Sequence, residues 1–319
     1  MGHDHDQRHD GHPNRRDMLG RCAGWAGTAA VYSVAGGVVS SVSLDAAAAA
    51  ERPATGARPF TFVQISDTHI GFDKPANPNV HGTAVQALER IKALPIKPAL
   101  ILHTGDITHL SKDEQFDEAK QILSGLDVPI FYVPGEHDFL DEGQGKAFLA
   151  HFGRGTQGLG WYSFDHNGVH FVALNNVAAL KPGGMAHLGD DQIAWLKKDL
   201  SGLPASTPIV VFAHIPLWTV YEAWGWGTDD ADQALALLRR FGSVTVLNGH
   251  IHQILHKVEG NVAFHSARST AYPQPAPGTA PSPGPLKVPA EQLPTMLGIR
   301  SAKFVPGRES VALIDASFT

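Results

Sequence analysis

FTFVQISDTH, residues 60–69, joins a run of apolar and β-branched residues to an acid and a histidine. A short apolar run of this kind is typical of a strand that is buried on both faces. We therefore expect residues 60–66 to form a buried strand, with Asp67 and His69 just beyond its carboxyl end.

Similar apolar runs recur along the chain and alternate with segments of helical periodicity. The further expected strands are 99–104, 129–133, 209–213 and 244–247, and the expected helices are 83–94, 112–126, 190–200 and 230–241. This alternation predicts an α/β fold with a mainly parallel sheet. Two hairpins are also expected, 161–164 with 169–174 and 302–305 with 310–314, and the Pro-rich stretch 273–289 is expected to be an extended surface loop.

Acids and histidines follow the expected strands at the same relative position. They are Asp67 and His69, Asp106, the run Glu136-His137-Asp138, His214, and the pair His250 and His252. Any one of them is more often a cap or a turn residue. Because the carboxyl ends of strands in an open α/β sheet form the ligand crevice, five such groups together predict a metal site.

The order of these groups resembles the signature of the calcineurin-like metallophosphoesterases, D-x-H, G-D, G-N-H-D, H, G-H-x-H. Here it is D-T-H, G-D, G-E-H-D, H, G-H-I-H, from Asp67 to His252. The resemblance implies a four-layer α/β/β/α sandwich. It also implies a hydrolase of phosphate monoesters or diesters that uses two metal ions (iron, manganese or zinc) and a hydroxide held between them.

The same resemblance implies a role for each residue of the signature. One metal would be held by Asp67, His69, Asp106 and His252, and the second by Asp106, Glu136, His214 and His250, with Asp106 shared. His137 corresponds to the family histidine that binds no metal and acts on the transition state or the leaving oxygen. Asp138 would either orient His137 or cap the segment that follows.

Glu136 departs from the family pattern, which has a neutral asparagine at this position. As a ligand, Glu136 would add a negative charge and favour ferric iron or manganese over zinc. The alternative is that its side chain turns away and leaves the second metal weakly held.

Two other functions fit parts of the pattern. A purple acid phosphatase-like monoesterase would have a tyrosine three residues after the shared aspartate, where this chain has His109. An exported metal- or phosphate-binding protein would need no counterpart of His137. Of the remaining candidates, His103 is expected in the core, His81 and His109 near the pocket, and the aromatic stretch 217–226 at one wall of the substrate mouth.

The N-terminus resembles a twin-arginine export signal. Arg15 and Arg16 precede a Gly- and Ser-rich apolar run, residues 22–44, and a cleavage site is expected near residues 46–50. This divides the chain into a signal peptide at 1–50, a linker at 51–58 and a catalytic domain at 59–319, and predicts a periplasmic or secreted protein. An uncleaved membrane anchor is the alternative.

Composition restricts the partners and the ligand types. The net charge of -6 argues against binding a nucleic-acid duplex. The single cysteine, Cys22, lies in the expected signal, so metal ligands must be histidines and carboxylates. A small phosphate ester and the twin-arginine machinery are the expected partners, and no stable membrane span is expected in the mature form.

Overall fold

The computed structural model describes residues 30–35, 38–43, 57–181, 183–308 and 311–319. Strands β1 (Ala30–Ala35) and β2 (Val38–Ser43) pair antiparallel and form a small sheet of their own. The other sheets belong to a separate unit, residues 51–319. The arginine pair Arg15 and Arg16, the expected cleavage site and most of the expected linker lie outside the described residues.

One sheet of the larger unit has five strands in the order β13-β12-β3-β4-β5. They are β3 (Phe60–Ile65), β4 (Leu100–His103), β5 (Ile130–Tyr132), β12 (Gly298–Phe304) and β13 (Ala312–Ser317). Strands β3, β4 and β5 are parallel, whereas β12 is antiparallel to both of its neighbours.

The second sheet has six strands in the order β10-β11-β9-β8-β7-β6. They are β6 (Tyr162–His166), β7 (Val169–Ala173), β8 (Ile209–Phe212), β9 (Val244–Asn248), β10 (Leu255–Glu259) and β11 (Val262–Ser266). Its centre is parallel from β7 to β11, and an antiparallel strand closes each edge.

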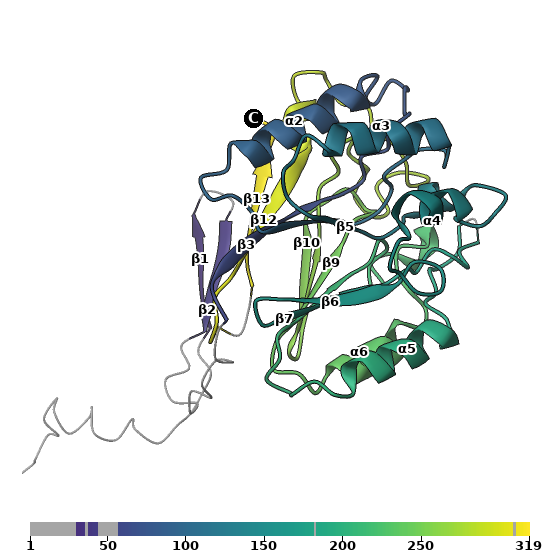
Figure 1. Ribbon diagram of the computed structural model, residues 1–319. Coiled ribbons are helices and arrows are strands. Elements are labelled where there is room, and N and C mark those ends of the chain that lie inside the picture. The colour runs from purple at the N-terminus through teal and green to yellow at the C-terminus, as the bar shows by residue number, and fades with distance from the viewer. Residues whose placement is uncertain (1–29, 36–37, 44–56, 182, 309–310) are drawn as a thin grey trace, which may run out of the picture. The chain divides into compact units, whose positions relative to one another are not determined.

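Helices cover the two outer faces (Figure 1). The first group is α2 (Val80–Lys92), α3 (Asp113–Leu123) and α4 (Lys146–Phe152), and the second is α5 (Asp190–Leu200) and α6 (Ala231–Leu238). Short helical turns are η1 (Glu136–Phe139), η2 (Glu222–Trp224) and α7 (Leu293–Met296). The predicted four-layer α/β/β/α sandwich is therefore confirmed.

Three apolar clusters fill the three interfaces between these layers. Ile65 and Ile101 face α2 and α3, while Phe62, Leu102 and Phe212 meet between the two sheets. On the far side, the other faces of β7, β8 and β9 pack against α5 and α6. Because each of these strands is covered on both faces, its sequence is an apolar run without polar alternation.

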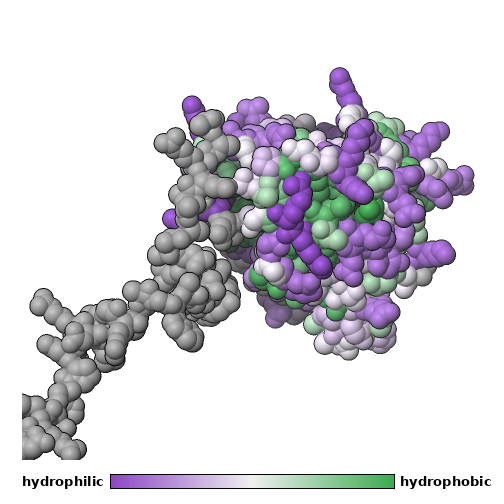
Figure 2. All heavy atoms as spheres, turned by 90° about the horizontal axis from the view of Figure 1, so that it is seen from below, coloured by the Kyte–Doolittle hydropathy of each residue, from purple (hydrophilic) through white to green (hydrophobic). Residues whose placement is uncertain are grey.

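Charged residues at the two ends of α5 stabilise this helix, in addition to the packing of its apolar face. Asp190 and Asp191 lie in the first turn of α5, and Lys197 and Lys198 lie in its last turn, which complements the helix dipole. Viewed from the side of α5 and α6, apolar residues gather in the middle of the face and hydrophilic side chains surround them (Figure 2). Within α5, the charged residues Asp191, Lys197 and Lys198 are exposed to solvent.

Most expected elements are present, with several differences. The hairpins β1–β2 and β10–β11 and helix α4 were not predicted, strand β12 begins four residues earlier than expected, and β13 begins two residues later. Lys257 and Glu259 interrupt the apolar pattern of β10, which is an edge strand and therefore tolerates them. Residues 273–289 contain no helix or strand, as expected. Among the described residues, no helix is long and apolar enough to cross a bilayer.

Candidate metal centre

The acids and histidines at the strand ends come together from both sheets. β3, β4 and β5 supply Asp67, His69, Asp106 and Glu136 from one sheet, and β8 and β9 supply His214, His250 and His252 from the other. Their potential ligand atoms form several overlapping groups within 4.8 Å of one another. The two sheets therefore meet at a cluster of nitrogen and carboxylate oxygen atoms.

A first cluster consists of Asp67, His69 and His252, all of which are buried. Nε2 of His252 lies 3.2 Å from Oδ1 of Asp67 and 3.3 Å from Nε2 of His69. Nδ1 of His252 donates a hydrogen bond to the carbonyl oxygen of Tyr272, 2.6 Å away. This bond holds the ring so that Nε2 faces the cluster.

A second cluster consists of Glu136, His214 and His250. The two oxygens of Glu136 each lie 2.9 Å from a ring nitrogen, one from Nε2 of His214 and the other from Nδ1 of His250. Nδ1 of His214 donates to the carbonyl oxygen of Thr104 at 2.7 Å, which directs Nε2 to the cluster. Glu136 therefore points into the site and not into solvent.

Asp106 lies between the two clusters. Its Oδ2 atom is 3.5 Å from Nε2 of His69 in the first cluster and 3.4 Å from Nε2 of His214 in the second. Its other oxygen, Oδ1, accepts a hydrogen bond from the backbone amide of His137 at 2.9 Å. One carboxylate is thus placed to serve both clusters.

The donor atoms fit bound cations. Nε2 of His214, Nδ1 of His250 and Oε2 of Glu136 are buried and have no hydrogen-bond partner, although they lie close to one another. Ligands about 2.1 Å from one ion, at angles of about 90° to 109°, stand about 3.0 to 3.4 Å apart. The separations of 2.9 to 3.5 Å in both clusters are close to these edge lengths.

The backbone is strained where it carries these side chains. Five of the residues have positive φ angles between 42° and 68°, a region that costs a non-glycine residue about 1 kcal/mol or more. They are Asp67, His69, Asp106, His250 and His252. Such strain is characteristic of functional sites, because the surrounding structure must offset it.

Two glycines are required here because other atoms approach them closely. A Cβ atom on Gly135 would lie 2.1 Å from Oδ1 of Asp106, and one on Gly249 would lie 2.0 Å from Oγ of Ser66. Neither glycine has a positive φ angle. Close packing, and not a positive φ angle, therefore requires glycine at these two positions.

Charge complementarity shifts the pKa values of the cluster. Burial alone would raise the pKa of Glu136, but His250 and His214 outweigh it and hold the value well below its usual range. Asp67 is shifted in the same direction by His252 and His214, again against the effect of burial. Burial would lower the pKa of His214, yet Asp106 and Glu136 raise it well above normal. Burial lowers the pKa of His69 well below its usual range, and the neighbouring His137 lowers it further.

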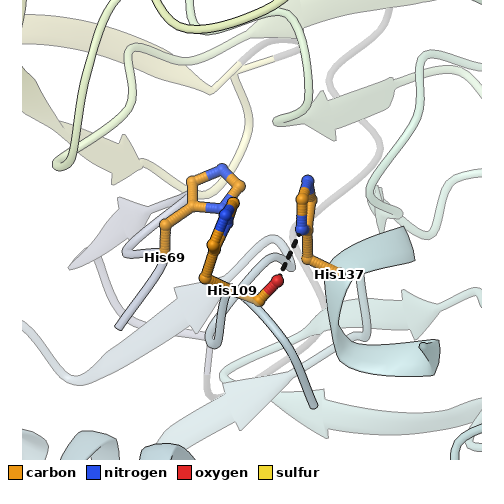
Figure 3. Close-up of side chains that lie close together, drawn as sticks. All are labelled: His69, His109 and His137. Carbon is orange, nitrogen blue, oxygen red and sulfur yellow. Dashed lines mark hydrogen bonds between the residues drawn. The ribbon is translucent and has the colours of Figure 1, made fainter. Parts of the chain in front are cut away.

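His137 lies at the rim of the cluster. Its Nδ1 atom donates to the carbonyl oxygen of His109 at 2.8 Å, and its ring stacks on that of His109 with centroids 4.7 Å apart (Figure 3). The ring also meets the ring of His69 edge to face. Burial would lower the pKa of His137, but Asp106 and Glu136 raise it. This imidazole is fixed in orientation, with Nε2 left for another partner.

Asp138 does not orient that imidazole, so this expectation is wrong. Its carboxylate accepts hydrogen bonds from the backbone amides of Ile107, Thr108 and Gly135 and from the hydroxyl of Thr108. Burial and then Asp106 raise its pKa to about 7, against the effect of these donors. Asp138 instead joins the strand end of β4 to the turn that carries Glu136, which is close to the capping role considered as the alternative.

The other candidate histidines differ in position. His103 is buried beneath the site, where burial lowers its pKa to about 3, and its Nε2 meets the hydroxyl of Thr68 at 3.1 Å, as expected for a core residue. His81 lies on the exposed side of α2, paired with Glu118 at 2.7 Å, so its expected place near the pocket is wrong. Burial and then His137 lower the pKa of His109, which does border the cluster, to about 4.

Aromatic side chains border the site on two sides. Trp226, from the stretch expected to form a wall, meets His250 edge to face at 6.2 Å, and Trp224 packs on Trp226. Tyr272 stacks on His69 with centroids 4.7 Å apart, and Phe72 packs on Tyr272. Sequence reasoning missed Tyr272, whose position in front of the Pro-rich stretch resembles an ordinary loop.

Known proteins resemble this chain in sequence or in fold. The family model described as calcineurin-like phosphoesterase matches residues 60–254. A 3',5'-cyclic-nucleotide phosphodiesterase of Nostoc sp. is 24% identical over 220 residues, covering 67% of this chain and 79% of the relative. A probable glycerophosphodiester phosphodiesterase of Arcobacter nitrofigilis is 24% identical over 224 residues, covering 66% and 78%. A dimetal phosphatase from Danio rerio has a similar fold, with a TM-score of 0.54 and 14% identity over 81% of this chain and 99% of that chain.

Proposed function

Since this chain belongs to the calcineurin-like phosphoesterase family and is a metal-dependent hydrolase of phosphate esters, we propose that it uses a dinuclear centre to cleave phosphodiesters. The first ion would be held by Asp67, His69 and His252, and the second by Glu136, His214 and His250. Asp106 would be a ligand of both.

The observation that carries the dinuclear proposal is the position of Asp106. Its Oδ2 atom is nearly equidistant from the histidine nitrogens of the two clusters, at 3.5 and 3.4 Å. A carboxylate with this position can bind two cations, which a histidine in its neutral form cannot do. The two clusters would therefore act as one site.

When bound, the ions would lower the pKa of a water molecule and offset the negative charge of the phosphate. The protein supplies the proton for the leaving oxygen. His137 is suited to this task because its Nδ1–H is held by the carbonyl oxygen of His109, so that the proton it delivers is on Nε2.

Glu136 sets the charge and hence the metal preference of the proposed centre. With Asp67 and Asp106 it places three carboxylates around the ions, one more than the family pattern with asparagine. The contacts of Glu136 with His214 and His250, 2.9 Å each, support its role as a ligand. We propose ferric iron or manganese as the preferred ion at this position, because a harder or more highly charged cation gains most from the added carboxylate.

A phosphodiester is the proposed substrate because the relatives that cover two thirds of this chain are named as phosphodiesterases. The test is to load purified protein with manganese, iron or zinc and to assay bis(p-nitrophenyl) phosphate against p-nitrophenyl phosphate. We expect the diester to be cleaved faster and a chelator to stop both reactions. Metal binding without turnover of either ester would favour a binding protein instead.

The same assay separates an enzyme from a binding protein through one variant. His137→Ala is expected to keep its metals and lose turnover by about a hundredfold or more, the usual scale for a positioned acid. The matched control is His81→Ala, which removes a surface histidine from α2 and should keep full activity. Full activity in His137→Ala would exclude this residue from the mechanism.

We also propose that the protein is exported, on the basis of its sequence. Arg15 and Arg16 ahead of an apolar run support a twin-arginine signal, which carries folded proteins across the membrane. Cleavage near residues 46–50 would leave residues 59–319 as the catalytic domain behind a short linker. A centre that is assembled from both sheets suits a route that exports the protein after folding.

A further inference from the structure

Tyr272 is packed directly against the proposed metal ligands. It follows β11, is 3% exposed, and its ring lies 4.7 Å from that of His69 and 4.8 Å from that of His252. Phe72 covers the ring from another side at 4.4 Å. The carbonyl oxygen of Tyr272 also accepts the hydrogen bond from Nδ1 of His252. Both its ring and its backbone therefore border the first cluster.

The turn that carries Tyr272 is joined to the ligand frame. Oγ of Ser269 donates to the carbonyl oxygen of Asp67 at 2.8 Å and accepts from the amides of Ala271 and Tyr272. The amide of Thr270 donates to the carbonyl oxygen of Ser66 at 3.1 Å. These bonds fix the tyrosine relative to Asp67, so its hydroxyl has little freedom to seek another position.

The hydroxyl itself is not used by the protein. Among the described residues, no group forms a hydrogen bond with it, in contrast to Tyr162, whose hydroxyl donates to the carbonyl oxygen of Tyr132. The ring of Tyr272 packs on both histidines of the first cluster, so the phenol stands beside the proposed ligands. The hydroxyl oxygen is not one of the buried polar atoms that lack a partner, so it is accessible to a ligand that enters the site.

We propose that the hydroxyl of Tyr272 donates a hydrogen bond to a phosphoryl oxygen of the bound substrate or of the phosphate product. The inference rests on the proposed function only in taking phosphate as the ligand of the centre. A phenol is suited to this position because it is a neutral donor that adds no charge among three carboxylates. Its ring packing would hold the donor in place before the ligand arrives, which reduces the entropy lost on binding.

The test uses Tyr272→Phe, which keeps the aromatic packing on His69 and Phe72 and removes only the hydroxyl. The metal-loaded protein is titrated with inorganic phosphate by calorimetry, and its metal content and melting temperature are measured separately. We expect phosphate affinity to fall by about 10- to 100-fold, the usual scale for a hydrogen bond to a charged group. Metal content and melting temperature should stay at wild-type values.

Tyr162→Phe is the matched control, because it also removes a tyrosine hydroxyl but at β6, where the partner is a backbone carbonyl of β5. Its phosphate affinity should equal that of the wild type. Equal affinity in Tyr272→Phe, with full metal content, would overturn the proposal. Loss of metal in that variant would also overturn it, because Tyr272 would then support the ligands and not the phosphate.

Two further readouts separate the alternatives. A visible absorption band in the ferric protein that disappears in Tyr272→Phe would identify the phenol as an iron ligand and overturn its role as a donor. Phosphate binding that weakens in Tyr272→Phe, in a wild-type protein that turns over no ester, would support the role of Tyr272 while the proposed hydrolase function fails. The two proposals can therefore fail independently.

Discussion

The backbone amide of His137 donates a hydrogen bond to Oδ1 of Asp106 at 2.9 Å. The residue proposed to deliver a proton is thus attached to the carboxylate proposed to join the two metal positions. Because Oδ1 is held by this amide, Oδ2 is the oxygen that faces both clusters. The side chain of Asp106 therefore helps to fix both the position of His137 and the proposed positions of the ions.

Removal of Asp106 should therefore affect both metal positions. We expect Asp106→Ala to lose both ions, measured as metal per chain by elemental analysis. The comparison is His252→Ala, whose side chain contacts only the first cluster and which should keep the second ion. Two tightly bound ions per chain in Asp106→Ala would show that the carboxylate is not shared.

Replacement of Glu136 by asparagine should change the choice of metal. Glu136→Asn removes one negative charge from the second cluster while keeping an oxygen ligand, so we expect two metals with selectivity shifted to zinc. The nucleophilic water should also lose its proton more readily, because the centre becomes more positive. The acidic limb of the pH–rate profile should move to lower pH. An unchanged metal preference together with an unchanged profile would exclude Glu136 as a ligand.

Addition of a single methyl group at Gly135 should disturb the centre. The new Cβ of Gly135→Ala would lie 2.1 Å from Oδ1 of Asp106, so either the carboxylate or the turn must move. We expect lower metal affinity and a lower melting temperature. Gly202→Ala is the control, because no atom lies within 4 Å of its added Cβ and it should behave like the wild type. Equal metal affinity in the two variants would contradict the packing argument.

His170, near the amino end of β7, should make stability depend on pH. Its Nδ1 atom lies 2.8 Å from Asp165, and its Nε2 atom lies 2.9 Å from Asp199. Burial would lower the pKa of His170, but these two carboxylates outweigh burial and raise it. A group whose pKa is raised by folding stabilises the fold below its unfolded pKa of about 6.5, and the contribution is lost as pH rises through the folded value. His170→Asn should therefore destabilise the protein more at pH 5.5 than at pH 9, measured by chemical denaturation.

The control for this effect is His256, whose pKa is lowered by burial and by Arg300. Its protonation opposes folding, so His256→Asn should favour stability at low pH and have little effect at high pH. A destabilisation by His170→Asn that is the same at both pH values would mean that the two aspartates do not hold a protonated imidazole.

Export gives a prediction that is independent of the metal centre. Replacement of Arg15 and Arg16 by lysine should leave the precursor inside the cell, detected by fractionation and by the mass of the product. The wild-type protein should have a mature N-terminus near residues 46 to 51. Efficient export of the double variant, or a full-length product bound to the membrane, would argue against a cleaved twin-arginine signal.

The expected elements that proved correct are those whose patterns are local. Residues 60–65 form a buried strand, because a strand covered on both faces needs no alternation of polar residues. Asp67 lies two residues after the end of this strand, so its place at the carboxyl end could be predicted with it. The convergence of the strand-end residues was expected from the strand pattern, and the structure places Glu136 and His250 2.9 Å apart. Resemblance to a family supplied the division into two clusters.

What sequence reasoning missed depends on contacts between distant segments. Asp138 was expected beside His137 because the two are neighbours in sequence, yet its carboxylate turns to amides of the strand end at Ile107 and Thr108. Tyr272 has no local pattern that marks it, and only the packing of its turn on Asp67 brings it to the site. Side-chain direction at a turn is set by tertiary contacts, which no short pattern contains.

The site has a consequence for the order of events during synthesis. His69 and His252 are 183 positions apart, and β12, which pairs with β3, emerges from the ribosome later still. A half-made chain therefore holds Asp67 and His69 without the histidine that faces them. Contacts this distant in sequence close slowly, because a long loop must be ordered first. The first of the two proposed metal positions would therefore be complete only after His252 has been made and has folded against His69.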